Sequence, residues 1–384
     1  MLQPTTDRAI LTTISDAQDH ARDWLFHHAA PLWSTAGLCA DGLFVERLTV
    51  EGAPVDMPRR VMVQARQIFS FLTIGELGWD GPWRDIMNRA VDQMLAKGRR
   101  PDGFFAHQLG ADGDIIDDRR DLYNHAFGLF ALGHAARVLD RPELAALARE
   151  IQEAADTQWL RPQGGYWEGE VTACPPHRQN PHMHLFEAAL ALHDATGDPY
   201  WRGLADRLGD LCRTRFIHGE TGALTEYFDA DWNRLPAPQG HIVEPGHCME
   251  WAWLFEVGFA DGAGVAIADG LSGFARRHGI CTERGVAINE IALDGSVIDA
   301  SARLWPQTER LKAATARHAR TGGEVEAQEV VAAYYGLTPY LDLPTRGLWY
   351  DRWLADGSWV QQDAPASSFY HIVCGLRELL NSEG

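Results

Sequence analysis

Hydrophobic and polar residues alternate along most of the chain with the period of an α-helix. The segment 121–140 is apolar on almost every side, which predicts a helix buried on most of its surface. The segment 367–380 carries apolar residues three or four positions apart, which predicts a helix with one apolar face. These positions are Phe369, Ile372, Val373, Leu376 and Leu380.

The segment 142–160 predicts a helix of another kind. Its sequence, PELAALAREIQEAADTQWL, has a charged face and an apolar face, as expected on the outside of a fold. Pro142 suits the first turn, because the N–H that proline lacks would have no partner there. Buried and half-exposed helices are therefore expected to follow each other in pairs.

A short motif recurs along the chain: a glycine, then an apolar or aromatic residue, usually with an acidic or polar residue close behind. It reads GLFVE, GFFAH, GYWEG, GALTE, GVAIN and GLWYD, beginning at Gly42, Gly103, Gly165, Gly222, Gly285 and Gly347. Consecutive glycines are 57 to 63 residues apart. This period predicts six tandem units, each with an extended segment, a buried helix and an outer helix, which must stack to bury their apolar faces.

The two ends of the chain favour a closed ring over an open array. The last unit ends after its buried helix, near Glu378 to Asn381, and an additional helix is predicted at about 7–30. That helix would cover the unpaired last one. We therefore predict an all-α fold, an (α/α)6 barrel of six inner and six outer helices with short hairpin-like segments in the loops. The whole chain, 1–384, is expected to form this one domain.

Ionisable residues occupy matching places in these units. Arg66, Glu309 and His371 each lie 24 residues after the motif glycine, and His247 lies 25 after it. The other two units place His125 and His184 at 22 and 19 residues. A single histidine on an apolar helix is usually a structural core residue. A set at one level of a barrel costs free energy to bury, which favours a functional role.

Three local motifs place some of these residues at helix starts. NPHMH (180–184), PGHCMEW (245–251) and LWPQTE (304–309) each contain a proline that suits a first turn. His247 and Glu250 are three residues apart and share a helix face. The predicted site therefore lies at the mouth of the barrel, where helix N-termini also favour negative charge.

Composition limits the function classes. The formal net charge of −19 argues against nucleic acid or an anionic membrane as partner. The six cysteines are scattered, and the chain has neither a long apolar run nor an apparent secretory signal at its start, so we expect a cytoplasmic protein with free thiols. There is no glycine-rich phosphate loop and no HExxH, so neither a nucleotide cofactor nor a metal ion is expected. The only lysines are Lys97 and Lys312, which leaves few candidates for a Schiff base.

At these residues the chain resembles the N-acylglucosamine 2-epimerase family. The matching stretches are QARQIFSF, DLYNHAFGLFALG, NPHMHLFEA, PGHCMEWAWL, RLWPQTERLKA and SSFYHIVCGL. The resemblance implies an (α/α)6 barrel that acts as a sugar 2-epimerase or aldose–ketose isomerase, and the motifs look most like the mannose isomerase branch. It also implies that the family's active-site positions fall on Arg66, Asn180, His184, His247, Glu250 and His371.

The mechanism expected from these residues is proton transfer at C1 and C2 of an open-chain sugar. We predict His247 and His371 as the proton-transfer residues, Glu250 as the partner that orients His247, and His184 as a further catalytic residue. The predicted substrate-binding residues are Arg66, Asn180, Glu309, Tyr123, His125 and Trp305. The expected partner is a monosaccharide, D-mannose or a related aldose such as lyxose, with no cofactor.

Other functions stay open at this point. A 2-epimerase differs from an isomerase only in the carbon to which the proton returns. A glycoside hydrolase would need two flanking carboxylates, for which Glu250 and Glu309 are candidates, although histidines outnumber carboxylates. A non-catalytic sugar-binding barrel is a third class, and the exposed outer helices are compatible with a homodimer.

Overall fold

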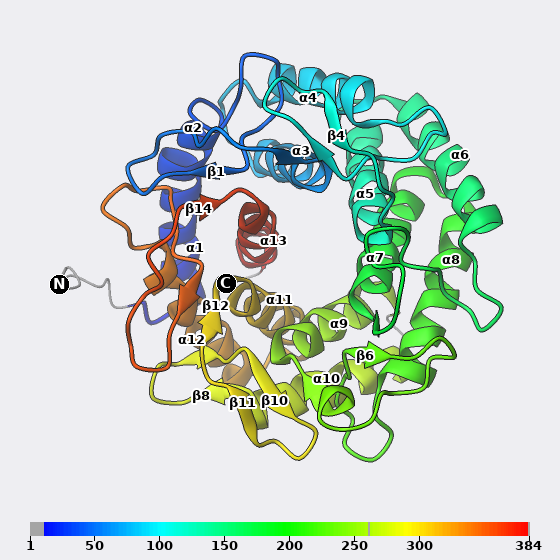
Figure 1. Ribbon diagram of the computed structural model, residues 1–384. Coiled ribbons are helices and arrows are strands. Elements are labelled where there is room, and N and C mark those ends of the chain that lie inside the picture. Colours follow the sequence, from blue (N-terminus) through cyan, green and yellow to red (C-terminus); the bar gives the residue numbers. More distant parts are fainter. Residues whose placement is uncertain (1–10, 260–261, 383–384) are drawn as a thin grey trace.

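The computed structural model describes residues 11–259 and 262–382, and within them helices form two concentric rings (Figure 1). The inner ring is made of α3 (Val61–Glu76), α5 (Leu122–Val138), α7 (Asn180–Thr196), α9 (Pro245–Gly258), α11 (Leu304–Thr321) and α13 (Ser367–Asn381). Each inner helix contacts the next, and α13 contacts α3, so the ring is closed. The predicted (α/α)6 barrel is confirmed.

The outer ring covers the inner one. It consists of α4 (Trp83–Gly98), α6 (Pro142–Gln158), α8 (Pro199–Leu211), α10 (Gly262–His278) and α12 (Glu324–Leu341), with α1 (Ile14–Asp23) in the sixth place. The burial of the two rings follows the sequence pattern. In α3 every residue from Val61 to Ile74 is buried, whereas in α6 only one face is.

The N-terminal helix closes the ring as expected but begins later than predicted. Thr13 caps α1 in a reciprocal capping box with Asp16, which satisfies the first free N–H groups and fixes the start at Ile14. The predicted residues 7–10 lie outside the described part. The helix also runs further, through a π-helical segment (Trp24–Ala29) and α2 (Ala30–Trp33). Its α1 part packs against α13 and α12, which supplies the missing outer partner.

The six motif glycines all adopt left-handed backbone conformations, with φ between 69° and 92°. Such conformations strongly favour glycine because a Cβ would clash. Each glycine lies between the end of an outer segment and the next inner helix. The long loops that carry these glycines therefore gather at one end of the barrel, where all six inner helices begin.

Short antiparallel strands tie these loops together. The pairs are β1 (Arg47–Leu48) with β14 (Ala364–Pro365), β5 (His177–Arg178) with β6 (Tyr227–Phe228), β8 (Ile280–Cys281) with β9 (Val286–Ala287), and β12 (Ala302–Arg303) with β13 (Arg352–Trp353). Two sheets have three strands: β2 (Arg59–Arg60), β3 (Gln108–Leu109) and β4 (Ile115–Asp117), and β7 (Ile242–Val243), β10 (Glu290–Ala292) and β11 (Val297–Asp299). The loops also contain a π-helical turn (Cys212–Phe216) and a 3-10 turn (Gln239–His241). The β1–β14 pair joins the first and last units and closes this end of the ring.

In two of the units, the acidic residue behind the motif glycine anchors the loop to the start of an inner helix. Glu46 accepts hydrogen bonds from the backbone N–H and the Nε of Arg60, directly before α3. Glu168 does the same for Arg178, before α7. These buried carboxylates fix where the inner helices begin.

No helix in the described residues is long and apolar enough to cross a membrane.

Candidate active site

The predicted site residues lie near the N-terminal ends of the inner helices. Prolines in the first turn of α7 and α9, Pro181 and Pro245, help to set where these helices start. As a result His184, His247 and Glu250 all fall in the first two turns of their helices. The side chains described below form one connected, mostly buried group that reaches across the barrel.

His371, Glu309 and Glu250 form one part of this group. The Nδ1 of His371 lies 2.9 Å from Oε1 of Glu309, whose side chain is fully buried. With a carboxylate as acceptor, Nδ1 carries the proton and Nε2 keeps its lone pair. One oxygen of Glu250 lies within 4.8 Å of ligand atoms of both residues. Three different helices, α9, α11 and α13, therefore meet at this point.

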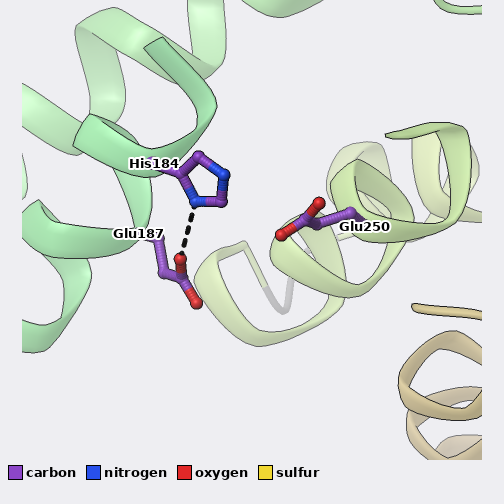
Figure 2. Close-up of side chains that lie close together, drawn as sticks. All are labelled: His184, Glu187 and Glu250. Atoms are coloured by element: carbon purple, nitrogen blue, oxygen red, sulfur yellow. Dashed lines mark hydrogen bonds and ion pairs between the residues drawn. The ribbon is translucent and has the colours of Figure 1, made fainter. Parts of the chain in front are cut away.

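His184 and Glu187 on α7 form the second part. Their Nδ1 and Oε2 atoms are 3.2 Å apart, and Figure 2 shows Glu250 pointing toward them from another helix. The hydroxyl of Tyr370 donates a 2.6 Å hydrogen bond to the same Glu187 oxygen. Glu250 therefore lies between two histidine–glutamate pairs, and neither of its oxygens has a hydrogen-bond partner in the described structure.

His247 has a different glutamate partner from the predicted one. Its Nδ1 lies 3.0 Å from Oε2 of Glu226, and Oε2 of Glu244 is 3.9 Å away. Glu226 belongs to the loop before β6, whereas Glu250 faces the barrel centre instead. The predicted pairing of His247 with Glu250 is therefore wrong. Two residues three apart share a helix face, but a closer carboxylate from a loop takes the histidine nitrogen.

Trp305 connects the two proton-transfer candidates. Its ring lies 4.8 Å from that of His247 and 5.7 Å from that of His371, measured between centroids. It is half-buried at the start of α11. Trp305 thus places an apolar ring in contact with both histidines.

Arg66 on α3 is a cation beside these side chains, and it forms no ion pair with a carboxylate among the described residues. It donates to the hydroxyl of Tyr123 and, over 3.0 Å, to the backbone carbonyl of Ser367. Its guanidinium lies 4.1 Å from the ring centre of Phe127, and only 4% of the residue is exposed. A charge held in this way, by neutral groups, is available to a developing anion.

Two further predicted residues stand at the edge of the group. The ring of Tyr123 packs 5.0 Å from that of His184. Asn180 is the first residue of α7, and its Oδ1 is buried without a hydrogen-bond partner among the residues described. Both side chains are half-buried.

His125 does not join the group. Its Nε2 lies 2.9 Å from Oε1 of Gln152 on the outer helix α6, and its ring packs against Phe104 and Trp159. The prediction that His125 binds substrate is not supported by this position, because the side chain points between the two rings. An offset of 22 instead of 24 residues turns a helical position away from the barrel axis.

Lys312 lies beneath the group, one turn after Glu309 on α11. Its Nζ is 2.7 Å from Oε2 of Glu309 and 3.9 Å from Oε1 of Glu250, and its side chain is fully buried. The clusters Glu250–Glu309–His371 and His184–Glu187–Glu250 have ligand atoms close enough for a metal ion. The ammonium group already supplies positive charge to both glutamates of the first cluster.

The surroundings of the histidines shift their pKa values in opposite directions. Burial opposes the charge on His247, but the carboxylates of Glu226 and Glu244 outweigh it and raise its pKa to about 9. Burial, helped by Arg66, lowers the pKa of His371 far below its ordinary value. Burial also lowers the pKa of His184 to about 4. At neutral pH, His247 is therefore a cation and His371 a neutral base.

The carboxyl groups differ as well. Burial and the nearby Glu309 raise the pKa of Glu250 far above its usual range, which favours a protonated acid that can donate a hydrogen bond. Burial would raise the pKa of Glu187, but the hydrogen bond from His184 and the charge of Lys312 lower it to about 2. The centre therefore combines a charged acid, a neutral base, a neutral carboxyl group and an arginine.

Some residues of this group were missed by the sequence reasoning. The predicted site residues do not include Glu187, Glu226, Glu244, Lys312 and Tyr370. Glu226 had a detectable signal, because it is the acidic residue four positions after Gly222, where the first unit carries Glu46. In the third unit the corresponding acid holds an arginine, whereas here it holds a histidine.

Comparison with known proteins defines the class. The model of the N-acylglucosamine 2-epimerase (GlcNAc 2-epimerase) family matches residues 42–375, and the chain belongs to this family. A protein of Rhizobium meliloti (strain 1021), named mannose-6-phosphate isomerase, is 40% identical over 368 residues, covering 93% of this chain and 95% of its own. A D-mannose isomerase of Thermobifida fusca is 30% identical over 259 residues, covering 58% and 59% of the two chains.

Solved structures agree on the fold. A crystal structure of D-mannose isomerase superimposes with a TM-score of 0.86 at 20% identity, covering 98% of this chain and 99% of the other. The resemblance predicted from the six sequence stretches is confirmed. The protein is an enzyme of the carbohydrate isomerase and epimerase class.

Proposed function

We propose that this enzyme is an aldose–ketose isomerase that interconverts D-mannose, or a related aldose, and the corresponding ketose, fructose for mannose. The observation that carries the proposal is the pair of histidines on either side of Trp305, one held as a cation by Glu226 and one held neutral with its Nδ1 on Glu309. Environments that shift the pKa values of two titratable groups in opposite directions define one as the acid and the other as the base.

The reaction begins at C2 of the open-chain aldose. Nε2 of His371 removes the C2 proton, the C–H electron pair forms the C1=C2 bond, and the C1 carbonyl oxygen takes a proton from His247. Arg66 and the protonated Glu250 stabilise the negative charge that develops on the C1 oxygen as the cis-enediol forms and on the C2 oxygen as the enediol is converted to the ketose. His371 then returns its proton to C1, the proton of the C2 hydroxyl passes back to His247, and the ketose results.

His184 and Asn180 have a separate task. Sugars bind mainly as rings, which must open before C2 can be deprotonated. His184, oriented by Glu187, takes the proton of the anomeric hydroxyl and delivers it to the ring oxygen as the C1–O5 bond breaks, and the unpartnered Oδ1 of Asn180 accepts a hydrogen bond from a sugar hydroxyl. General acid–base steps of this kind typically contribute about 10²- to 10⁴-fold in rate.

The alternative outcome is 2-epimerisation. An epimerase must run in both directions, so the group that donates at C2 in one direction must accept at C2 in the other. A histidine whose pKa is raised to about 9 is a poor acceptor at neutral pH, whereas His371 alone can move a proton from C2 to C1. The charge arrangement therefore supports isomerisation.

The substituent at C6 defines a second candidate, mannose 6-phosphate, which the name of the 40%-identical relative favours. The arginines one or two residues before α3, α7 and α11 are each paired with a glutamate. The pairs are Arg60–Glu46, Arg178–Glu168 and Arg303–Glu244. A phosphate would have to displace a carboxylate from one of them, which supports a neutral sugar as substrate.

The test is incubation with mannose in D2O, followed by NMR of the products, with mannose 6-phosphate in a parallel series. Fructose deuterated at C1, appearing before any glucose, is the expected result. Glucose deuterated at C2 as first product would make the enzyme an epimerase. The ratio of kcat/KM for mannose and mannose 6-phosphate decides whether the preferred substrate carries a hydroxyl or a phosphate at C6. Undiminished activity after chelation is expected, because no step requires a metal ion.

A further inference from the structure

Lys312 is a buried cation that the reaction scheme above does not use. It lies on α11 with its side chain fully buried, and its Nζ lies 3.9 Å from the ring centre of Trp253. Burying an ammonium group is costly unless an opposite charge compensates for it. Here Glu309, whose Oε2 lies 2.7 Å from Nζ, provides that charge, and Oε1 of the neutral Glu250 lies 3.9 Å away.

The cation faces the carboxyl group on which His371 depends. Oε2 of Glu309 contacts Lys312, and Oε1 contacts Nδ1 of His371, so one carboxylate bridges the lysine and the histidine. Without the lysine, Glu309 would be a buried acid with only the negative charge of Glu187 nearby. Like charges at short range drive one carboxyl group to bind a proton.

A proton on Glu309 would disable His371 as a base. A protonated Glu309 donates to Nδ1 instead of accepting from it, which places the imidazole proton on Nε2. Nε2 is the nitrogen that would take the sugar proton. The state of Glu309 therefore decides which tautomer His371 adopts.

We propose that Lys312 is a positioning residue: by keeping Glu309 ionised it holds His371 in the tautomer with a free Nε2. The lysine acts through Glu309 and does not touch the sugar. For its catalytic consequence, this inference rests on the proposed function.

All the charged and titratable groups that face His371 bear on its pH behaviour. Arg66 comes from α3, His184 and Glu187 from α7, and Glu250 from α9. Glu309 and Lys312 come from α11, and Tyr370 is the neighbour on α13. Loss of the lysine charge raises the pKa values of both Glu309 and His371. Both changes move the acidic limb of the kcat profile in the same direction, toward higher pH.

A Schiff base between Lys312 and the open-chain sugar is the competing role. It needs an uncharged amine that reaches the carbonyl carbon. The ion pair with Glu309 and the full burial of Nζ argue against this, since the neighbouring carboxylates raise the pKa of the lysine above its ordinary value, against the effect of burial. Borohydride added during turnover distinguishes the roles, because a reduced sugar–lysine adduct in the mass spectrum would overturn a positioning role.

The decisive variant is K312M, which keeps an unbranched side chain one atom shorter and removes its charge. NMR of ¹⁵N-histidine-labelled protein, with His371 assigned by comparison with H371Q, reports the tautomer without any substrate. Wild-type protein is expected to show the proton on Nδ1, and K312M is expected to show it on Nε2. An unchanged tautomer in K312M would refute the proposal even if no aldose were turned over, whereas a wild-type enzyme inert toward all aldoses would refute the proposed function alone.

Kinetics provide the second measurement. In K312M, kcat at pH 7 is expected to fall by about 10-fold or more with little change in KM, and the acidic limb is expected to move up by about one pH unit. K97M is the matched control, because Lys97 on α4 is the other lysine of the chain and is remote from the histidines. A lower melting temperature of K312M with an unchanged acidic limb of its kcat profile would indicate that the lysine has a merely structural role.

A double variant keeps the test valid if K312M does not fold. K312M/E309Q removes both members of the ion pair and so leaves no unpaired charge between them. If Lys312 acts only through Glu309, the double variant has nearly the kcat of E309Q. A further loss of about 10-fold or more relative to E309Q would show that the lysine acts elsewhere, and would overturn the proposal.

Discussion

Two histidine–glutamate pairs in this barrel have the same local geometry and opposite protonation. His247 binds Glu226 at 3.0 Å and His371 binds Glu309 at 2.9 Å, in both cases through Nδ1. His247 has a second carboxylate nearby, whereas Arg66, His184 and Lys312 surround His371. The difference teaches that the partner fixes the tautomer, while the more distant charges decide whether the ring is an acid or a base.

The largest expected effect comes from removing the base. H371Q is predicted to lower kcat by about 10⁴-fold, the upper end of what a positioned acid or base contributes, and H247Q by about 10²-fold. The difference arises because a carbon-bound proton has no other acceptor in place, whereas the sugar oxygen can also take a proton from water. Single-turnover rates with mannose measure both.

Deuterium exchange separates the two roles further. In D2O, H247Q is expected to incorporate deuterium slowly at C2 of recovered mannose, and H371Q is not. The reverse pattern would exchange the assignments of acid and base. Equal exchange in both variants would remove the distinction between the two pairs.

A smaller effect is predicted for the carboxylate that charges His247. In E226Q the main charge that raises the pKa of His247 is gone, so burial lowers that pKa from about 9. Activity that requires the imidazolium is lost as pH rises through its pKa, and the alkaline limb of kcat therefore moves to lower pH. If the limb falls to about pH 7.5, kcat at about pH 8.5 should be about 10-fold below its value at about pH 6.5, because the charged fraction drops tenfold per pH unit above the pKa.

E168Q is the matched control for this prediction. Glu168 is the corresponding acid of the third unit, but it binds Arg178 and does not contact His247. Its removal can lower stability, yet the alkaline limb should stay in place. If the alkaline limb moves equally in both variants, the shift reflects a general destabilisation of the loops at this end of the barrel and not the loss of the charge beside His247.

The sequence predicts the ring better than it predicts the partners within it. Helical periodicity and the motif glycines depend on local packing and backbone conformation, so the six units and their closure could be inferred. Contacts such as His247–Glu226 join an inner helix to the loop before it, and their distance depends on how that loop folds. Matching offsets placed Arg66, Glu309 and His371 at one level, but a change of two residues was enough to misplace His125.

The smallest effect on activity is therefore expected at His125. In H125F the ring still packs against Phe104 and Trp159, but Oε1 of Gln152 loses its partner in a buried position. An unsatisfied buried group costs about 1–3 kcal/mol, so the denaturation midpoint should fall. The kcat/KM for mannose should stay within about twofold of wild type, as for other changes that do not touch the transition state.

H184F is the counterpart that makes this result informative. His184 is also a buried histidine on an inner helix, and its ring lies 4.5 Å from Phe127 between centroids, so phenylalanine meets similar apolar surroundings. It is within 4.8 Å of Glu250, however, and the same substitution should abolish ring opening. Activity lost in H125F but kept in H184F would mean that the reacting sugar lies between α5 and α6, outside the group that the two histidine pairs define.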